Sequence, residues 1–369
     1  MGCRKGFYSA PSTTRRRATA PNCWNSSLIS GPVVDLTAFS DRLSTQLLDF
    51  VWEEWAQMGV SAPAHRESPW AQDPEALLVF TLEIARADPR LFDELLDWTL
   101  HNEGLLSVRR LRATCIDEAD RALVAAMISW LGRRRPRARL RSSERPQAPR
   151  DLEPVFDGGA PVEHADPDFA AQGLLRPSAE PSRKSQAPNL RSPINFDFRL
   201  RAMLGVGIRA EVVRIMLCVH APQMTAGALA RTSAYAKRNV HDALAGLADA
   251  GAISVFRISG EQRYTIDKSA WAALLDLAPE RLPSHREWPQ LLAVLRTILR
   301  WSRQSDLIEA SEYLRASANR QLLEHIRPEL AFAGVKTNLR ATAAEAPAAL
   351  EQVVQDILVD LNPARALVP

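Results

Sequence analysis

Hydrophobic residues spaced three and four positions apart predict helices along most of this chain. The first such helix begins at Leu36 and ends near Gly59, where a glycine suits a helix C-terminus. Asp73-Pro74 and Asp88-Pro89 each supply an N-cap followed by proline at the first helical position, so each opens another helix. Two more helices are expected over 108–116 and 118–131. Together these stripes predict a helical bundle over residues 35–132.

A second pattern, over residues 209–266, combines helices with a hairpin. A helical stripe over 209–220 ends at Pro222, and Thr225 is placed to cap a short helix. A longer helix is expected from near Ala234, with one buried face formed by Val240, Leu244 and Leu247. After Gly251, strand-like alternation over 253–258, a turn at 259–261 and a return over 263–266 predict a hairpin.

This order of elements resembles the MarR/ArsR-type winged-helix superfamily of bacterial regulators. The resemblance covers residues 199 to about 271 and is carried by the basic hairpin together with Thr225, Leu229-Ala230, Val240, Leu244, Leu247 and Gly251-Ala252-Ile253. It implies a winged helix-turn-helix and binding to double-stranded DNA. Some winged helices bind protein instead, so the resemblance favours the fold more strongly than the function.

The full expectation is a mainly α protein built from a helical bundle, a linker, a winged helix with a small β-hairpin wing, and a helical C-terminal tail. The boundaries are a disordered extension over 1–34, an acidic helical domain over 35–132, a basic proline-rich linker over 133–198, the winged helix over 199–275, and the tail over 276–369. In the tail, Pro289 starts a strongly amphipathic helix. The tail serves either for dimerisation or for packing back on the same protomer.

Charge is unevenly distributed behind a net value of +3. Residues 35–120 contain roughly ten more acidic than basic residues, whereas 133–150 is strongly basic. Acidic residues such as Glu53-Glu54 and Asp93-Glu94 are expected on the solvent side of the bundle, which would repel phosphate and favour a protein partner. The basic linker is expected to be extended and mobile, either as a phosphate-binding arm or as a solubilising tether.

The remaining composition points to the cytoplasm. Four cysteines lie far apart without metal-site spacing, as in a reduced protein with free thiols, and no apolar run is long enough to cross a bilayer. Residues 1–32 lack Asp and Glu and carry Arg15-Arg16-Arg17, a composition shared with transit peptides. We interpret them as a disordered extension or as the product of a start codon placed too far upstream.

A winged helix places its third helix in the major groove and its wing against the backbone or minor groove. On this template Arg238 is expected on guanine and Asn239 on adenine, and Lys237 and Thr225 on phosphate. The candidate DNA contacts are Thr225, Tyr235, Lys237, Arg238, Asn239, His241, Arg257, Gln262 and Arg263.

Other chemistry has little support in the sequence. Cys218 and His220 provide two potential ligands where a tetrahedral metal site needs four, and no nucleophile-base arrangement is apparent, so no enzyme, metal or cofactor is expected. The leading hypothesis is a sequence-specific DNA-binding transcriptional regulator that acts as a homodimer. The alternative is a winged-helix protein-interaction component of a larger complex, such as an antitoxin-like or defence system, with a partner held by the acidic domain.

Overall fold

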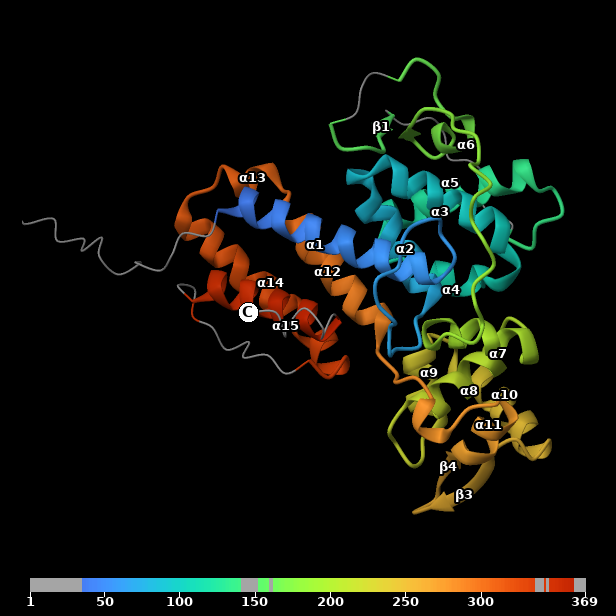
Figure 1. Ribbon diagram of the computed structural model, residues 1–369. Helices are drawn as coiled ribbons and strands as arrows, with labels where there is room; N and C mark the ends of the chain where they lie inside the picture. The colour runs from blue at the N-terminus through green and yellow to red at the C-terminus, as the bar shows by residue number, and fades with distance from the viewer. Residues whose placement is uncertain (1–34, 141–151, 159–161, 336–341, 343–344, 362–369) are drawn as a thin grey trace, which may run out of the picture. The chain divides into compact units, whose positions relative to one another are not determined.

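The structure is a computed structural model that describes residues 35–140, 152–158, 162–335, 342 and 345–361. These residues are mainly helical, with two small sheets (Figure 1). None of the helices in the described ranges combines the length and apolar character needed to span a membrane. The predicted N-terminal extension lies outside these ranges. Residues 141–150, which make up most of the basic run over 133–150, also lie outside them.

The N-terminal helices form where the hydrophobic stripes and caps predict them. Asp35, Asp73, Asp88, Ser107 and Asp117 each accept a backbone hydrogen bond at a helix start. Such caps satisfy N–H groups that have no partner within the helix. The elements are α1 (Leu36–Gln57), α2 (Pro74–Ile84), η1 (Ala85–Ala87), α3 (Pro89–Asn102), η2 (Glu103–Leu105), α4 (Val108–Ala113) and α5 (Glu118–Arg134).

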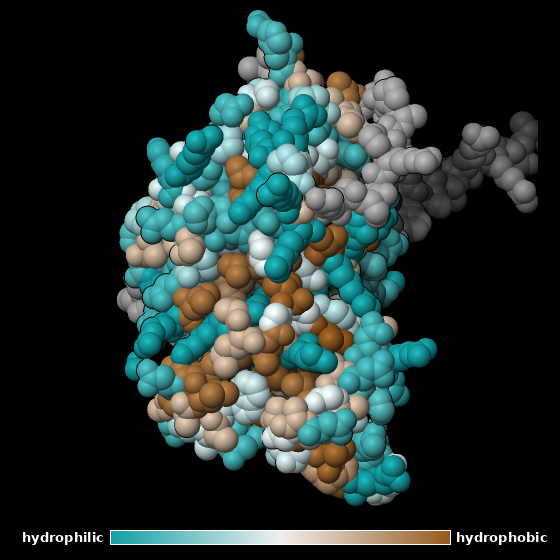
Figure 2. All heavy atoms as spheres, turned by 90° about the vertical axis from the view of Figure 1, so that its right-hand side faces the viewer, coloured by the Kyte–Doolittle hydropathy of each residue, from teal (hydrophilic) through white to brown (hydrophobic). Residues whose placement is uncertain are grey.

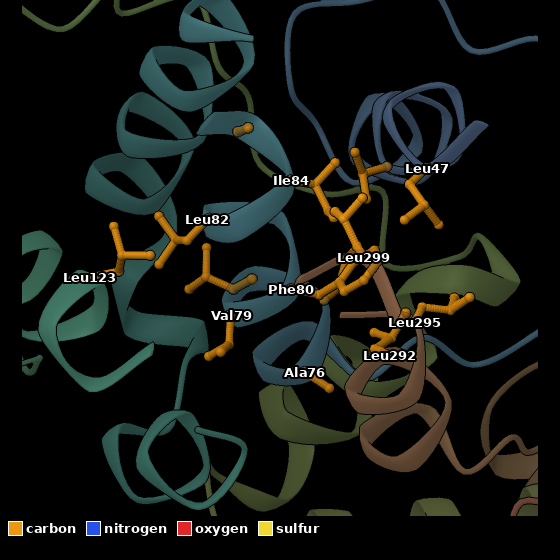
Figure 3. Packing of buried hydrophobic residues seen from close by; sticks show 14 of the residues in the cluster. Leu47, Ala76, Val79, Phe80, Leu82, Ile84, Leu123, Leu292, Leu295 and Leu299 are labelled. Atoms are coloured by element: carbon orange, nitrogen blue, oxygen red, sulfur yellow. The ribbon is translucent and has the colours of Figure 1, made fainter. Parts of the chain in front are cut away.

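Helix α2 is the centre of the larger hydrophobic core, and every one of its residues is buried. Phe80 and Ile84 are turned toward Leu47 of α1 and Leu299 of α12, while Leu82 is turned toward Leu123 of α5 (Figure 3). A helix that is buried on every face needs packing partners on every side. Its neighbours therefore come from both ends of the chain.

The C-terminal helices complete this same core. They are α12 (Trp288–Ser302), α13 (Ser305–Ile308), α14 (Glu312–Phe332) and α15 (Ala346–Leu361), and α12 packs against both α1 and α2. Leu295, Leu323 and Ile357 belong to one hydrophobic cluster with Leu47 and Phe80. The predicted tail thus packs back on its own protomer, and dimerisation through it remains a prediction.

The predicted linker needs correction over residues 152–158 and 162–198. The side chain of Arg176 is buried, with its guanidinium 4.8 Å from the ring centroid of Phe169 and Nη2 donating to Asp93 Oδ1 at 2.7 Å. Further along, the backbone amides of Arg183, Lys184 and Ser185 donate to the Asp97 carboxylate. This segment contains β1 (Glu153–Pro154), α6 (Pro167–Ala170), β2 (Leu174–Leu175) and η3 (Pro193–Asn195).

This segment also packs closely against the end of α1. Gly59 has a φ of +105°, and a Cβ atom there would lie 2.5 Å from the backbone oxygen of Gln186. The amide of Gln186 in turn donates to the Gly59 carbonyl at 2.8 Å. Only glycine permits both the backbone conformation and the close approach. The chain after Gln186 is thereby fixed against the bundle instead of forming a free tether.

A second hydrophobic cluster is formed by residues between 196 and 282 together with Ala71. Its elements are α7 (Phe196–Leu204), α8 (Ile208–Cys218), α9 (Ala226–Ser233), α10 (Lys237–Asp249), β3 (Ser254–Ile258), β4 (Glu261–Thr265), α11 (Lys268–Leu274) and η4 (Pro279–Arg281). Strands β3 and β4 pair antiparallel, and Met224, just before α9, bridges to Tyr264. Ser259 and Gly260, both with positive φ, form the two-residue turn that suits a twisted hairpin.

Candidate nucleic-acid interface

Helix α10 is amphipathic, with one buried and one exposed face. Val240 and Leu244 are fully buried, and Ala243 and Leu247 are nearly so. Lys237, Arg238 and His241, on the first turns of the opposite face, are exposed. The spacing that buries the apolar stripe therefore turns the basic residues outward.

The two cations at the start of α10 are available for a ligand. Among the described residues, neither Lys237 nor Arg238 has an ion pair or hydrogen bond with another side chain. The exposed carboxylate nearest to them on this helix is that of Asp242, one turn beyond Arg238; the other, Asp249, is at the far end of the helix. Asn239 is half-buried, so less of its amide can reach outward than the sequence suggested.

The prediction that Tyr235 contacts DNA needs correction. Its side chain is only 8% exposed and belongs to the hydrophobic cluster of this region. Helix α9 continues to Ser233, Ala234 adopts a left-handed conformation with φ of 56°, and α10 begins three residues later than expected, at Lys237. The turn directs Tyr235 inward, where an apolar ring is more stable than in water. Tyr235 is therefore a packing residue.

Thr225 is also occupied. It precedes α9, and its Oγ1 atom accepts a hydrogen bond of 3.1 Å from the amide of Ala228. The predicted N-cap is confirmed, but the hydroxyl is committed to the helix. A phosphate contact would have to use its remaining hydrogen-bonding capacity.

The hairpin is tied to α10 through Gln262. His241 Nε2 lies 3.2 Å from Gln262 Oε1, and the Tyr264 hydroxyl donates to the same oxygen at 3.1 Å. Gln262 and His241, both predicted as DNA contacts, thus help to fix the angle between helix and hairpin. Arg263 pairs with Glu261 at 2.8 Å. Arg257 is exposed and has no ion pair among the described residues.

Beneath this surface lies a cluster of buried charges, defined by Asp73, Glu75, Arg110, Asp197, Arg201, Glu211 and Arg214, which we call the charged junction. It joins the helical bundle to α7 and α8. Arg201 Nη1 and Nη2 donate to both oxygens of Glu75 at 2.6 and 2.7 Å. Arg214 Nη2 donates to Glu211 Oε1 at 2.5 Å. Buried charges of this kind require paired, hydrogen-bonded partners.

Arg110 connects the charged junction to the turn before α10. It donates to Asp73 and Glu75, and its Nη1 donates to the Ser233 carbonyl at 2.5 Å. Ser233 is the last residue of α9. A guanidinium from the bundle therefore holds the turn that orients α10.

The charged junction contains four carboxyl groups and three guanidinium groups. The pKa values of its carboxyl groups are shifted in opposite directions. Burial raises the pKa of Asp197 to about 7, although Arg201 favours its ionised form. Burial acts in the same direction on Glu211, but Arg110 and Arg214 lower the pKa of that carboxyl to about 2. Burial also raises the pKa of Asp73, so one proton shared between Asp73 and Asp197 would balance the charges.

Arg110 and the charged junction are the main features that sequence reasoning missed. The available signal was the basic run Val108-Arg109-Arg110-Leu111-Arg112 within an otherwise acidic region. Asp73 was recognised only as a helix cap, which it is, with Oδ1 accepting from Ala76 at 3.0 Å. Its second role depends on partners that are distant in the sequence.

The cysteine considered for metal binding lies in the hydrophobic cluster. Burial raises the pKa of the Cys218 thiol to about 12, so it is protonated at neutral pH. Within the described ranges, no group of three or more His, Cys, Asp or Glu side chains is placed to hold a metal ion.

Comparison of the chain with protein-family models, curated proteins and solved structures finds no significant match. The functional assignment therefore rests on the residues and geometry of the chain itself.

Proposed function

We propose that this chain is a sequence-specific DNA-binding transcriptional regulator. In this proposal α8 to α11 and the β3–β4 hairpin form a winged helix-turn-helix. Helix α10 is the recognition helix that enters the major groove, and the hairpin is the wing.

The supporting observation is the exposed, unpaired state of Lys237 and Arg238 on a helix whose opposite face is buried. In this proposal Arg238 reaches the base edges, because the two-pronged donor set of arginine fits guanine O6 and N7. The lysine is suited to phosphate, which positions the protein without reading sequence. Arg257 on the hairpin supplies a third cation for the backbone or the minor groove.

The first test combines Lys237→Ala with Arg238→Ala and measures binding to a duplex selected by the wild-type chain from a random-sequence pool. A bidentate base contact contributes about 1–3 kcal/mol, and a phosphate contact adds to it. We expect affinity to fall by roughly tenfold to a thousandfold. Unchanged affinity would exclude α10 as the recognition helix.

The chain offers a matched control in Arg183 and Lys184. These are likewise adjacent and exposed, but they lie on the segment that packs against Asp97. Arg183→Ala with Lys184→Ala removes the same two charges. We expect this control to retain most of the affinity, which would show that position and not net charge decides binding.

A second function is favoured by the apolar character of the hairpin. Val255, Phe256 and Ile258 are 47%, 39% and 43% exposed. Figure 2 shows hydrophobic side chains among hydrophilic ones over the lower part of the molecule, which carries α7 to α11 in Figure 1. Clustered exposed apolar residues often mark protein-binding surfaces. The corresponding proposal is a winged-helix protein-interaction module.

Ionic strength separates the two functions. DNA affinity should fall steeply as salt rises, because phosphate contacts release counterions. An apolar interface should be nearly insensitive to salt. Phe256→Ser with Ile258→Ser should abolish protein binding through the hairpin but leave α10-dependent DNA binding largely intact.

A further inference from the structure

Arg109 of α4 lies beside the start of α10 although the two are far apart in sequence. Its guanidinium carbon is 4.8 Å from the ring centroid of Tyr235. Tyr235 precedes Lys237, the first residue of α10, by two positions. Arg109 itself is exposed. The helical bundle thus places a cation next to the proposed recognition helix.

This position is fixed by contacts on both sides of Arg109. The next residue, Arg110, donates to the Ser233 carbonyl at 2.5 Å. The hydroxyls of Ser107 and Tyr235 form a hydrogen bond. Ser107 is the N-cap of α4, and its Oγ accepts from the Arg110 amide. Helix α4 and the α9–α10 turn are therefore joined by hydrogen bonds before and after Arg109.

The donors of Arg109 remain free. Among the described residues, the Arg109 guanidinium makes a cation–π contact with the Tyr235 ring and forms no ion pair or hydrogen bond. Stacking on an aromatic face leaves the N–H groups at the edge of the planar guanidinium available for an anion. It also restricts the side chain before binding, which lowers the entropic cost of a contact.

We infer that Arg109 is a DNA phosphate contact that the helical bundle contributes to the recognition surface. The inference rests on the proposed function and extends it, because the surface then includes residues from two regions of the chain. Its charge complements phosphate together with Lys237 and Arg238. The acidic character of the bundle as a whole does not extend to α4, where three of the four residues 109–112 are arginine.

The test measures DNA affinity as a function of salt for wild type, Arg109→Ala and Arg109→Lys, using the duplex selected by the wild-type chain. Loss of one phosphate contact should lower the slope of log affinity against log salt by about one. It should also weaken binding about five- to tenfold near 0.1 M salt. Arg109→Lys should keep most of the wild-type slope because lysine keeps the positive charge. Thermal unfolding without DNA should be nearly unchanged in both variants.

Arg90→Ala is the matched control. Arg90 is also an exposed arginine of the bundle that stacks on an aromatic ring, with its guanidinium carbon 5.3 Å from the centroid of Trp52. We expect it to leave affinity and salt slope unchanged. An unchanged slope for Arg109→Ala would overturn the inference, provided that Lys237→Ala with Arg238→Ala still weakens binding. If the double variant binds as tightly as wild type, or if wild type does not bind DNA at all, the proposed function is overturned instead.

Discussion

The α10 surface and the charged junction contain the same kinds of residue in opposite environments. Lys237, Arg238 and Arg257 are exposed and lack ion-pair partners among the described residues. Arg110, Arg201 and Arg214 are each at most 4% exposed and contact carboxylates directly. The first set is free to bind something else, whereas the second is fully committed to the fold.

The difference shows that burial, more than residue type, decides what an arginine does here. An exposed ion pair contributes roughly 0–1 kcal/mol, so removing an exposed arginine barely changes stability. Removing one partner of a buried pair leaves an uncompensated charge and costs about 3–5 kcal/mol. Arg109 and Arg110 are neighbours on α4, but only Arg110 is buried. Substituting each in turn therefore tests the effect of burial.

Arg110→Met should have the largest effect on stability. The variant leaves Asp73, Glu75 and the Ser233 carbonyl without the guanidinium that they share. We expect the free energy of unfolding in urea to fall by about 3–5 kcal/mol. The turn before α10 should also loosen, so DNA affinity should fall even where the variant remains folded.

Arg109→Ala, one residue away, is the internal control for that experiment. It removes an exposed side chain that contacts the Tyr235 ring. Its stability cost should stay below about 1 kcal/mol. Equal losses of stability for the two variants would contradict the division between committed and free arginines.

Local features of this chain could be predicted from sequence because they depend on neighbouring residues. The caps at Asp73 and Asp88 and the hairpin turn at Ser259-Gly260 are set by side chains within a few positions. The stripe of Val240, Leu244 and Leu247 predicted the buried face of α10 for the same reason. Lys237 and Arg238 lie outside that stripe, so their exposure could be predicted as well.

Contacts between distant segments could not be predicted in this way. The expectation that the acidic residues face solvent is wrong for several of them, including Glu54, Glu75 and Glu94. The partner of Glu75, Arg201, is 126 positions away, and no local pattern indicates that pairing. Arg176 lies in the segment predicted as a linker, but aromatic rings from three segments surround its guanidinium.

Glu54 is a buried carboxyl outside the charged junction, and among the described residues it has no guanidinium paired with it. Its side chain is on α1, and its Oε2 atom has no hydrogen-bond partner. Burial, reinforced by Glu53, raises the pKa of Glu54 from 4.5 to about 8. The folded state therefore binds a proton that the unfolded state releases above about pH 4.5. The stability from this group is present below that pH and is lost as pH rises through about 8.

Glu54→Gln should remove this dependence. Between about pH 5 and 8, one extra proton in the folded state changes the free energy of unfolding by about 1.4 kcal/mol per pH unit. Urea unfolding at several pH values should show wild-type stability falling more steeply with pH than that of the variant. All other titrating groups are common to both proteins, so the difference isolates Glu54. Parallel pH profiles would contradict a protonated Glu54 in the folded state.

The smallest predicted effect concerns Ala234, which lies where the charged junction meets the exposed helix. Its φ of 56° is in the left-handed region, which costs a residue with a Cβ about 1 kcal/mol. Ala234→Gly should therefore raise the free energy of unfolding by up to about 1 kcal/mol. Ala250→Gly is the matched control, because Ala250 ends α10 at an ordinary φ of −78° and gains nothing from glycine. If Arg110 and Tyr235 fix the turn, Ala234→Gly should also leave DNA affinity unchanged. A loss of affinity with a gain in stability would instead show that the alanine itself orients α10.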